Sequence, residues 1–299
     1  RMIPEVNKGD LIWAEHFVRY IFSGQFVANK KVLDIACGSG FGTAYLAGKK
    51  AKHVVGIDIS EEAIDYAKEK YSLKNVKFLV GDCEDIPLPD NSIDIVVSFE
   101  TLEHVSNYEK FIQELKRVSR PGALLILSTP NEKVFPKGNP FHLKEFNYGE
   151  LNTLLKKYYR NNKFLFENNW FSSAVLSKEG VLAEDLKNPQ SNIDLIKLAS
   201  SDPTNSLYFV VLASDSEIPK EVNQKVGLFS PSVDFTTKLA GALQEKEVLD
   251  GRISDLERIA KERESELKSI YSSRTWKLAD SLRGIKRNLK KLIKPDNEE

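Results

Sequence analysis

The sequence has few cysteines, no excess of charge of either sign and no long apolar run. Its two cysteines, Cys37 and Cys83, lie far apart in 299 residues and form no CxxC pair. This argues against a disulfide framework and favours a reducing, cytoplasmic location. Lysine plus arginine and aspartate plus glutamate both number 43, so net charge favours no class of partner. No stretch of about 18 apolar residues occurs, so no membrane-spanning helix is predicted.

The sequence does contain a regular alternation of strand-like and helix-like segments. Continuous apolar runs, typical of buried strands, occur at 31–36, 53–58, 76–82, 93–99, 124–130, 163–170 and 207–214. Apolar residues at helical spacing occur at 61–71, 108–119 and 148–159, and Ser60 is the expected N-cap of the first of these helices. The alternation predicts an α/β fold, a largely parallel sheet with helices on both faces and an antiparallel last strand.

After residue 214 the alternation of strand-like and helix-like segments ends. Residues 215–238 contain prolines and little periodicity, so we expect them to link a domain at 1–214 to a helical extension. Over 239–272 a heptad seam comprises Ala242, Lys246, Leu249, Ile253, Leu256, Ala260, Arg263, Leu267 and Ile270. The seam predicts a coiled coil, dimeric or trimeric, although its Lys246 and Arg263 weaken it; one long solvated helix is the alternative.

Residues 273–294 predict a basic amphipathic helix. Its apolar stripe is Leu278, Leu282, Ile285, Leu289 and Leu292. Its other faces carry Arg274, Lys277, Arg283, Lys286, Arg287, Lys290, Lys291 and Lys294, opposed only by Asp280. Such a helix suits peripheral contact with an anionic inner membrane or an acidic partner. A packing helix with a solvated basic face is the simpler interpretation.

The stretch "VLDIACGSGFG" (32–42) is a strand followed by a glycine-rich turn. Binding of a dinucleotide would require GxGxxG, but the glycines here give GxGxG and Thr43 takes the third fingerprint position. A phosphate-binding P-loop is excluded because no Lys-Ser/Thr pair follows the glycines. Asp34 lies inside the strand, where a carboxylate is costly to bury unless it is hydrogen-bonded or serves a site.

Acidic residues also follow the neighbouring strands. Asp58 ends the second strand, Asp82 ends the third, and "SFETLEH" (98–104) spans the end of the fourth. Because parallel strands end at one edge of the sheet, these carboxylates surround one ligand position. They would repel a pyrophosphate but suit a ligand with an ammonium group, a ribose diol and an adenine amino group. S-adenosylmethionine is such a ligand.

With these residues identified, the sequence resembles the class I S-adenosylmethionine-dependent methyltransferases. The motifs that carry the resemblance are "VLDIACGSGFG", "VVGIDIS", "GDCEDIPLPDNSIDIVVSFETLEHV" and "RVSRPGALLILSTP". Together they are far more specific than the glycine turn alone, and the resemblance covers roughly residues 1–214. It implies an enzyme with S-adenosylmethionine as cofactor and a Rossmann-like, seven-stranded sheet.

The resemblance also implies roles for residues of the first strand and turn. Gly38 and Gly40 would let the backbone approach the methionine part of the cofactor. Asp34 would orient this turn and reach toward the cofactor's amino group. Phe99, at the end of the fourth strand, is assigned to the same binding surface.

The ribose and adenine are expected at the next two strand ends, again by resemblance. Asp58 would accept hydrogen bonds from the ribose hydroxyls, with Ile59 against the adenine. Asp82 would accept a hydrogen bond from the adenine amino group, with Cys83 beside the ring. The simpler interpretations are a turn or cap residue at Asp82 and a buried small apolar residue at Cys83.

A closer resemblance concerns the methyl acceptor. "RMIPE", "EHFVRYIF", "SFETLEH" and "NPFHLKEF" are similar to methyltransferases of bacterial surface-polysaccharide (O-antigen) gene clusters, and "SSRTWKLADSLR" resembles a tail of glycosyltransferases in those pathways. This implies a glycan or nucleotide-sugar substrate and a glycosyltransferase partner. A quinone or amino-sugar methyltransferase, or a cofactor-binding scaffold of a glycan-synthesis complex, remains an alternative. No nucleic-acid partner is predicted, because the basic run is confined to the tail.

A sugar hydroxyl is a poor nucleophile, so a general base is expected near the end of the fourth strand. The candidates are His104, Glu100 and His142. If a helix begins directly after this strand, Glu100 and His104 lie on one of its faces. A capping or core role for His104 and packing of His142 on Phe141 are the simpler interpretations. No metal site is predicted, because no HExxH motif or Cys/His cluster appears.

Overall fold

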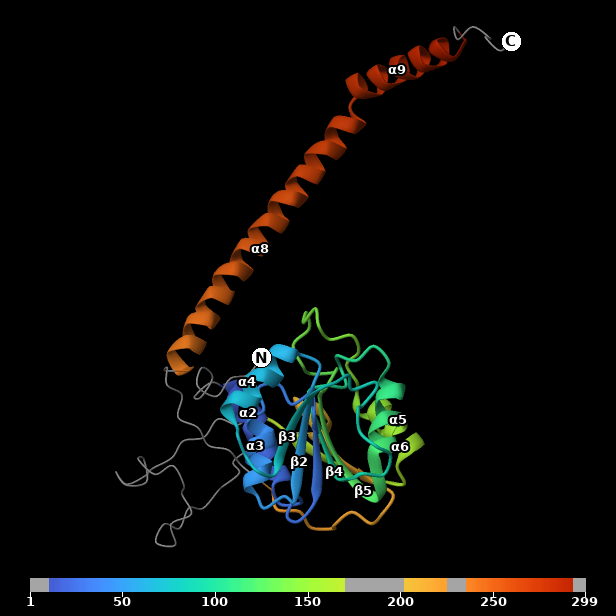
Figure 1. Ribbon diagram of the computed structural model, residues 1–299. Helices are drawn as coiled ribbons and strands as arrows, with labels where there is room; N and C mark the ends of the chain where they lie inside the picture. The colour runs from blue at the N-terminus through green and yellow to red at the C-terminus, as the bar shows by residue number, and fades with distance from the viewer. Residues whose placement is uncertain (1–10, 170–201, 225–234, 293–299) are drawn as a thin grey trace, which may run out of the picture. The chain divides into compact units, whose positions relative to one another are not determined.

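The computed structural model describes residues 11–169, 202–224 and 235–292, and the chain divides into two compact units, Arg1–Ser232 and Val233–Glu299. The first unit is built on one seven-stranded sheet (Figure 1). Its strands are β1 (Lys31–Ile35), β2 (His53–Asp58), β3 (Val76–Val80), β4 (Ile93–Phe99), β5 (Ser119–Pro130), β6 (Asn161–Glu167) and β7 (Tyr208–Ser214). The predicted fold class is confirmed.

The strand order in the sheet is β3-β2-β1-β4-β5-β7-β6. The pairs from β3 to β5 are all parallel, whereas β7 runs antiparallel to both β5 and β6, as predicted for the last strand. From β1 the chain adds β2 and β3 on one side and β4 and β5 on the other. The order therefore reverses between β1 and β4, and ligands of open α/β sheets bind beyond the carboxyl ends of the strands at such a point.

Helices cover both faces of this sheet. They are α2 (Leu11–Ser23), α3 (Phe41–Gly48), α4 (Glu61–Lys70), α5 (Tyr108–Val118) and α6 (Tyr148–Tyr158), with a short 3-10 helix at Pro203–Asn205. Side-chain caps fix where three of them begin. Ser60 accepts from Ala63 N as predicted, and Asn107 accepts from Lys110 N. Asn147 and Glu150 form a reciprocal capping box at α6.

The alternation of side chains along each strand builds two cores, one on each face. Leu33 and Ile35 of β1 point to the α5 and α6 side, where Phe111 and Leu151 are fully buried. Val32 points to the other side and packs with residues of α2 and α3. Figure 1 shows α2, α3 and α4 on one face of the sheet and α5 and α6 on the other. Burial on both faces is the reason why the strands read as continuous apolar runs.

No helix begins directly after β4, so the condition under which Glu100 and His104 would lie on one helix face is not met. Glu100 has a left-handed φ of 49°, and residues 101–104 form a turn in which His104 N donates to Thr101 O at 2.9 Å. The helix α5 begins only at Tyr108, because the Asn107 side chain caps it there. Glu100 and His104 therefore do not share a helix face.

The segment after β7 does not leave the domain at once. Ile218 and Val222 pack against the α2/α3 core, and Asn223 N donates to Gln25 Oε1 at 3.0 Å. Lys116 also pairs with Asp215. Residues 215–224, the first part of the predicted 215–238 linker, thus belong to the first unit and pack on its domain.

The described part of the second unit consists of two helices, α8 (Phe235–Ser272) and α9 (Arg274–Leu292). The first covers the predicted heptad seam at 239–272, and the second covers the predicted basic helix as far as Leu292, whereas Lys294 lies outside the described residues. Ser273 separates them, and its Oγ accepts a hydrogen bond from Trp276 N at 3.2 Å, which caps α9. Within the described residues, no helix is both long and apolar enough to cross a membrane.

Candidate active site

The glycine turn lies directly after β1, at the point where the strand order reverses. Gly38 and Gly40 have φ values of 54° and 79°, a left-handed region that glycine adopts without steric cost. A Cβ on Gly38 would meet no atom within 4 Å, so the backbone there is open to an approaching ligand. A Cβ on Gly40 would instead lie 2.7 Å from Ala67 Cβ and 2.8 Å from the Phe78 ring. The two glycines thus serve access and close packing, respectively.

The buried Asp34 carboxylate stabilises this turn through hydrogen bonds. Its carboxylate accepts hydrogen bonds from Thr43 Oγ1 at 2.6 Å and from Tyr20 OH at 3.2 Å, and the residue is 1% exposed. Burial raises the pKa of Asp34 to about 7, although both hydrogen bonds act to lower it. The carboxylate therefore joins β1 to the first turn of α3 and to α2. This geometry fits the orienting role that the resemblance implied, whereas the predicted reach of Asp34 toward the cofactor's amino group stays a prediction.

Gly42 is the site of a strong steric prediction. An added Cβ would lie 1.9 Å from Cζ of Tyr20, whose ring packs edge-on against Phe41 and Phe99 and whose hydroxyl is held by Asp34. The ring cannot move aside without breaking these contacts. We expect Gly42→Ala to lower the free energy of unfolding by about 1–3 kcal/mol, the usual cost of overpacking, in urea denaturation.

The matched control for this prediction is Gly48→Ala at the end of the same helix. A Cβ there meets nothing within 4 Å, so stability should stay unchanged or rise by up to about 1 kcal/mol, because alanine favours helix. Equal effects of the two substitutions would contradict the close approach of Tyr20 to Gly42.

Asp58, at the end of β2, faces the same turn. Its Oδ2 accepts from Gly38 N at 2.8 Å and its Oδ1 accepts from Ser60 N at 2.9 Å. Each oxygen keeps a second lone pair for another donor. Beside it, the Ile59 side chain is 73% exposed. The pair offers two acceptors for a diol and an apolar surface for an adenine ring.

Asp82 and Cys83 lie on the loop after β3. Asp82 accepts from Glu84 N at 2.8 Å, so it also stabilises its own turn. Cys83 packs partly against the α5/α6 core, and burial raises the pKa of its thiol to about 12. A thiol with this pKa is neutral and unreactive at neutral pH. Their predicted roles toward the adenine, as acceptor and apolar neighbour, stay predictions.

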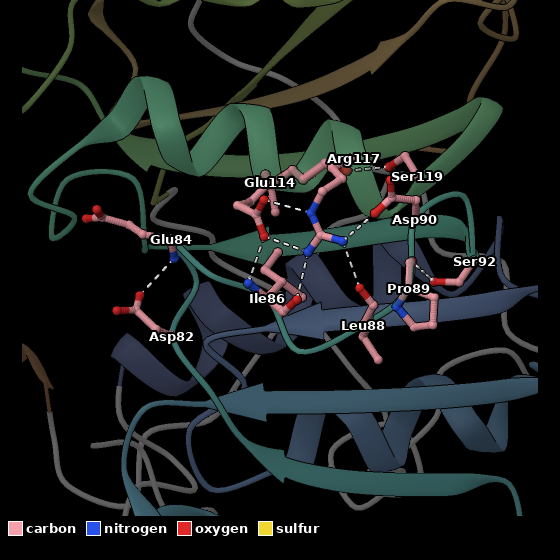
Figure 2. A network of polar contacts seen from close by, with 11 residues as sticks. Asp82, Glu84, Ile86, Leu88, Pro89, Asp90, Ser92, Glu114, Arg117 and Ser119 are labelled. Atoms are coloured by element: carbon pink, nitrogen blue, oxygen red, sulfur yellow. Dashed lines mark hydrogen bonds and ion pairs between the residues drawn. The ribbon is translucent and has the colours of Figure 1, made fainter.

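Arg117 of α5 holds this loop, as Figure 2 shows. Its guanidinium donates to the carbonyl oxygens of Ile86 and Leu88 at 2.7 and 2.8 Å and to Asp90 Oδ1 at 2.7 Å. Glu114 completes the network, accepting from Arg117 and from Ile86 N at 2.8 Å. One planar side chain thus fixes the loop that carries Asp82, a positioning role that no sequence pattern indicated.

The assignment of Phe99 to the cofactor surface needs correction. Phe99 is 6% exposed, and its ring packs edge-to-face on Tyr20 with 5.0 Å between centroids. The alternation of β4 directs this side chain into the α2/α3 core. Its contribution is to hold Tyr20, and through Tyr20 the Asp34 carboxylate.

The three predicted catalytic residues gather near the carboxyl ends of β4 and β5. Glu100 Oε1 accepts from Ser128 Oγ at 2.7 Å. The rings of His104 and His142 meet edge-to-face, 4.8 Å between centroids. The loop after β5 brings His142 there, because Leu143 N and Lys144 N both donate to the Glu103 carbonyl oxygen. The fold therefore brings the two histidine rings into contact, and it places Glu100 directly after the end of β4.

Arg19 of α2 is a residue that sequence reasoning missed. Its side chain is 1% exposed, its Nε donates to Glu167 Oε2 at 2.6 Å, and its Nη1 lies 3.3 Å from Glu100 Oε1. Its guanidinium also stacks 4.2 Å above the Tyr208 ring. The Arg19 guanidinium thus supplies the positive charge that pairs with both the Glu100 and the Glu167 carboxylates. No local pattern distinguishes it, since an arginine in an amphipathic helix usually faces water.

Residues 33–127 match the family model described as a methyltransferase domain. The family match and S-adenosylmethionine-dependent relatives imply S-adenosylmethionine as the cofactor, and the open backbone at Gly38, the spare lone pairs of Asp58 and the exposed Ile59 fit it. The class that the sequence motifs resembled is therefore supported, whereas no finding bears on O-antigen gene clusters.

Three relatives show how far the similarity of the methyltransferase domain extends. A probable S-adenosylmethionine-dependent methyltransferase of Mycolicibacterium smegmatis is 35% identical over 161 residues, covering 52% of this chain and 62% of that protein. A fatty-acid O-methyltransferase of the same organism is 31% identical over 101 residues, covering 33% and 37%. A demethylmenaquinone methyltransferase of Staphylococcus aureus is 29% identical over 171 residues, covering 56% and 68%. The chain thus spans less than two thirds of the first two.

Proposed function

We propose that this protein transfers the methyl group of S-adenosylmethionine to an acceptor hydroxyl held near the carboxyl ends of β4 and β5. The observation that carries the proposal is Asp58, whose two oxygens lie at the glycine turn beside the exposed Ile59. When bound, the cofactor supplies the methyl group of its sulfonium. The sulfur keeps the S–C bonding pair, so the cofactor leaves as a neutral thioether.

The protein's own contribution is to position the acceptor and take up its proton. His104 Nδ1 donates to Phe141 O at 2.8 Å, so in this tautomer Nε2 carries the free lone pair. Nε2 can accept the hydroxyl proton as the new O–CH3 bond forms. Holding both reactants in line supplies much of the rate.

For the acceptor, we propose a glycan hydroxyl or that of an activated sugar precursor. The support is the resemblance of "EHFVRYIF", "SFETLEH" and "NPFHLKEF" to methyltransferases of surface-polysaccharide gene clusters. A small-molecule acceptor is the second candidate, since the fatty-acid and demethylmenaquinone methyltransferases that share this domain are named for small molecules.

A methyl-transfer assay with radiolabelled cofactor tests the function and separates the two candidates. The full chain is incubated with lipid-linked glycans, nucleotide sugars, quinols and fatty acids, and labelled products are mapped. Label on a sugar oxygen supports the glycan acceptor, and label on a quinol or a fatty acid supports the small-molecule candidate. Cofactor binding without transfer to any class would instead favour a scaffold role.

We further propose that α8 forms a coiled coil between copies of this chain. The described seam residues Leu249, Ile253, Leu256, Leu267 and Ile270 are 49–65% exposed on a helix of 38 residues. A long helix with an apolar seam at heptad spacing buries that seam against a partner helix. Oligomers would hold several catalytic units together.

Replacing Leu256 with glutamate should dissociate this oligomer, because a charge on the seam cannot be buried without a partner. The expected result is a shift to the monomer mass in sedimentation equilibrium of the full chain. The matched control is Ser254→Glu, two residues away and off the seam, which should keep the oligomer. If wild type is monomeric, the coiled coil does not form.

For α9, we propose peripheral attachment to an anionic membrane, with an acidic protein partner as the alternative. Arg283 stacks over the Trp276 ring at 4.8 Å, and Leu278, Leu282 and Ile285 are 56–68% exposed. Basic and apolar groups on one helix are the combination that binds such surfaces. Flotation of the full chain with anionic vesicles tests this; equal flotation with neutral vesicles would contradict it.

A further inference from the structure

Three side chains next to the acceptor region converge on one point. A carboxylate oxygen of Glu103 and one ring nitrogen each of His104 and His142 all lie within 4.8 Å of one another. They come from two segments, the turn after β4 and the loop after β5. Spacing in the sequence predicted no metal site, because the second histidine is supplied by a loop that only the fold brings near.

The hydrogen bonds of the two imidazoles leave the same atom available on each. His104 Nδ1 donates to Phe141 O at 2.8 Å, and His142 Nδ1 donates to Glu145 Oε1 at 2.7 Å. Both Nε2 atoms therefore carry lone pairs. A histidine whose Nδ1–H is held by a carbonyl or carboxylate is the usual arrangement of a metal-ligating imidazole, because that contact fixes the ring and raises the basicity of Nε2.

Glu103 supplies an independent observation. Its side chain is 1% exposed, and its Oε2 accepts from Thr129 Oγ1 at 3.0 Å. Its Oε1 has no hydrogen-bond partner among the described residues and lies 3.8 Å from His104 Nε2. A buried carboxylate oxygen without a partner is costly. A cation at the point where the histidine nitrogens converge would satisfy it.

We propose that Glu103 Oε1, His104 Nε2 and His142 Nε2 bind a divalent transition-metal ion. Two imidazoles and one carboxylate are a donor set that suits zinc, iron or manganese, and three protein ligands leave positions open for water or substrate. At the usual bond lengths, two ligands of a tetrahedral ion lie about 3.3 Å apart. The observed separations of up to 4.8 Å therefore need small side-chain rotations.

A metal ion here would replace His104 as the activating group in the proposed function, on which this consequence rests. An ion on Nε2 leaves His104 no lone pair for a proton, so His104 becomes a ligand instead of the base. The open coordination positions would hold the acceptor oxygen and lower the pKa of its hydroxyl. The proton would then leave to solvent as the methyl–oxygen bond forms. Acceptors with two adjacent hydroxyls, which can chelate the ion, would be favoured.

Metal binding itself is the test, and it does not depend on activity. The full chain is freed of metal with a chelator and titrated with Co²⁺ by visible absorption and with Zn²⁺ by calorimetry. We expect one ion per chain, with affinity lowered at least about 10-fold in His142→Ala and Glu103→Gln. The matched control is His53→Ala at the start of β2, which should bind as wild type does.

Several outcomes would overturn the site. They are no binding by wild type, a cobalt–thiolate absorption band that places the ion on cysteine, or an equal loss in His53→Ala. Circular dichroism confirms that each variant folds, and His142→Ala decides the question if Glu103→Gln does not fold. Asp58→Ala should leave metal binding intact, so failure of the cofactor site and failure of the metal site are told apart.

Discussion

Alanine at position 58 is expected to weaken binding of S-adenosylmethionine roughly 10²- to 10⁴-fold, to a level at which calorimetry detects no heat. Asp58 offers two charged oxygens to the ribose hydroxyls, and hydrogen bonds to charged groups contribute about 1.5–3 kcal/mol each. The carboxylate also accepts a hydrogen bond from Gly38 N at 2.8 Å, so its loss releases the turn that is predicted to contact the methionine part. Both effects act in the same direction.

Two further variants make this prediction specific. Asp58→Asn keeps one carbonyl oxygen and should bind more weakly than wild type but more tightly than Asp58→Ala. Asp65→Ala on α4, whose side chain is 66% exposed, removes the same charge from the same region and should bind normally. Binding by Asp58→Ala within a few-fold of wild type, in a folded protein, would contradict the ribose role.

Replacing Arg19 with methionine is expected to lower the free energy of unfolding by about 3–5 kcal/mol, the usual effect of removing one partner of a buried ion pair. The guanidinium is the positive charge that Glu100 and Glu167 share. Methionine fills part of the volume but leaves both carboxylates without a counter-charge. Urea denaturation of the two proteins at one pH measures the difference.

The pH dependence of this loss has a definite sign. Burial raises the pKa of Glu167 to about 7 in the native state, even though Arg19 lowers it, against 4.5 for an unperturbed glutamate. The native protein therefore binds more protons than the unfolded chain between these values, and this group lowers stability as the pH rises through that window. Without Arg19 the native pKa rises further, so the loss should be larger near about pH 8 than near about pH 5.

Two comparisons test the cause of the Arg19 effect. The double variant Arg19→Met/Glu167→Gln should recover part of the lost stability, because the uncompensated charge is gone. Arg120→Met removes an arginine from a partly exposed pair with Asp94 and should cost only about 0–1 kcal/mol. No recovery in the double variant, or a pH-independent loss, would mean that packing and not charge explains the Arg19 effect.

Features that depend on local pattern could be predicted from the sequence. The strands of the parallel region are buried on both faces, so their sequences are continuous apolar runs. The antiparallel direction of β7 was predicted because no helical segment of usual length precedes it. Asp58 could be predicted as a site residue because it ends the strand that follows the glycine turn, whereas the role of Ile59 came from the family resemblance. Ser60 was identifiable as a cap because it directly precedes a helical pattern.

Features that depend on tertiary contacts could not be predicted. Arg19 lies in an ordinary helical sequence, and only packing against β4 and β6 buries it. Phe99 is predicted to lie at the cofactor surface, but the alternation of side chains along β4 directs its ring toward Tyr20. The meeting of His104 with His142 depends on two backbone hydrogen bonds to the Glu103 carbonyl oxygen, which no spacing rule encodes.

The most direct test of the central claim is a calorimetric titration of the full chain with S-adenosylmethionine. We expect saturable binding with one cofactor per chain, competition by S-adenosylhomocysteine, and no binding of NAD. Saturable binding and competition follow from a site for a ribose and an adenine without phosphates. The lack of NAD binding follows from the carboxylates, which would repel a pyrophosphate. An absence of heat with S-adenosylmethionine, or tighter binding of NAD, would contradict the account.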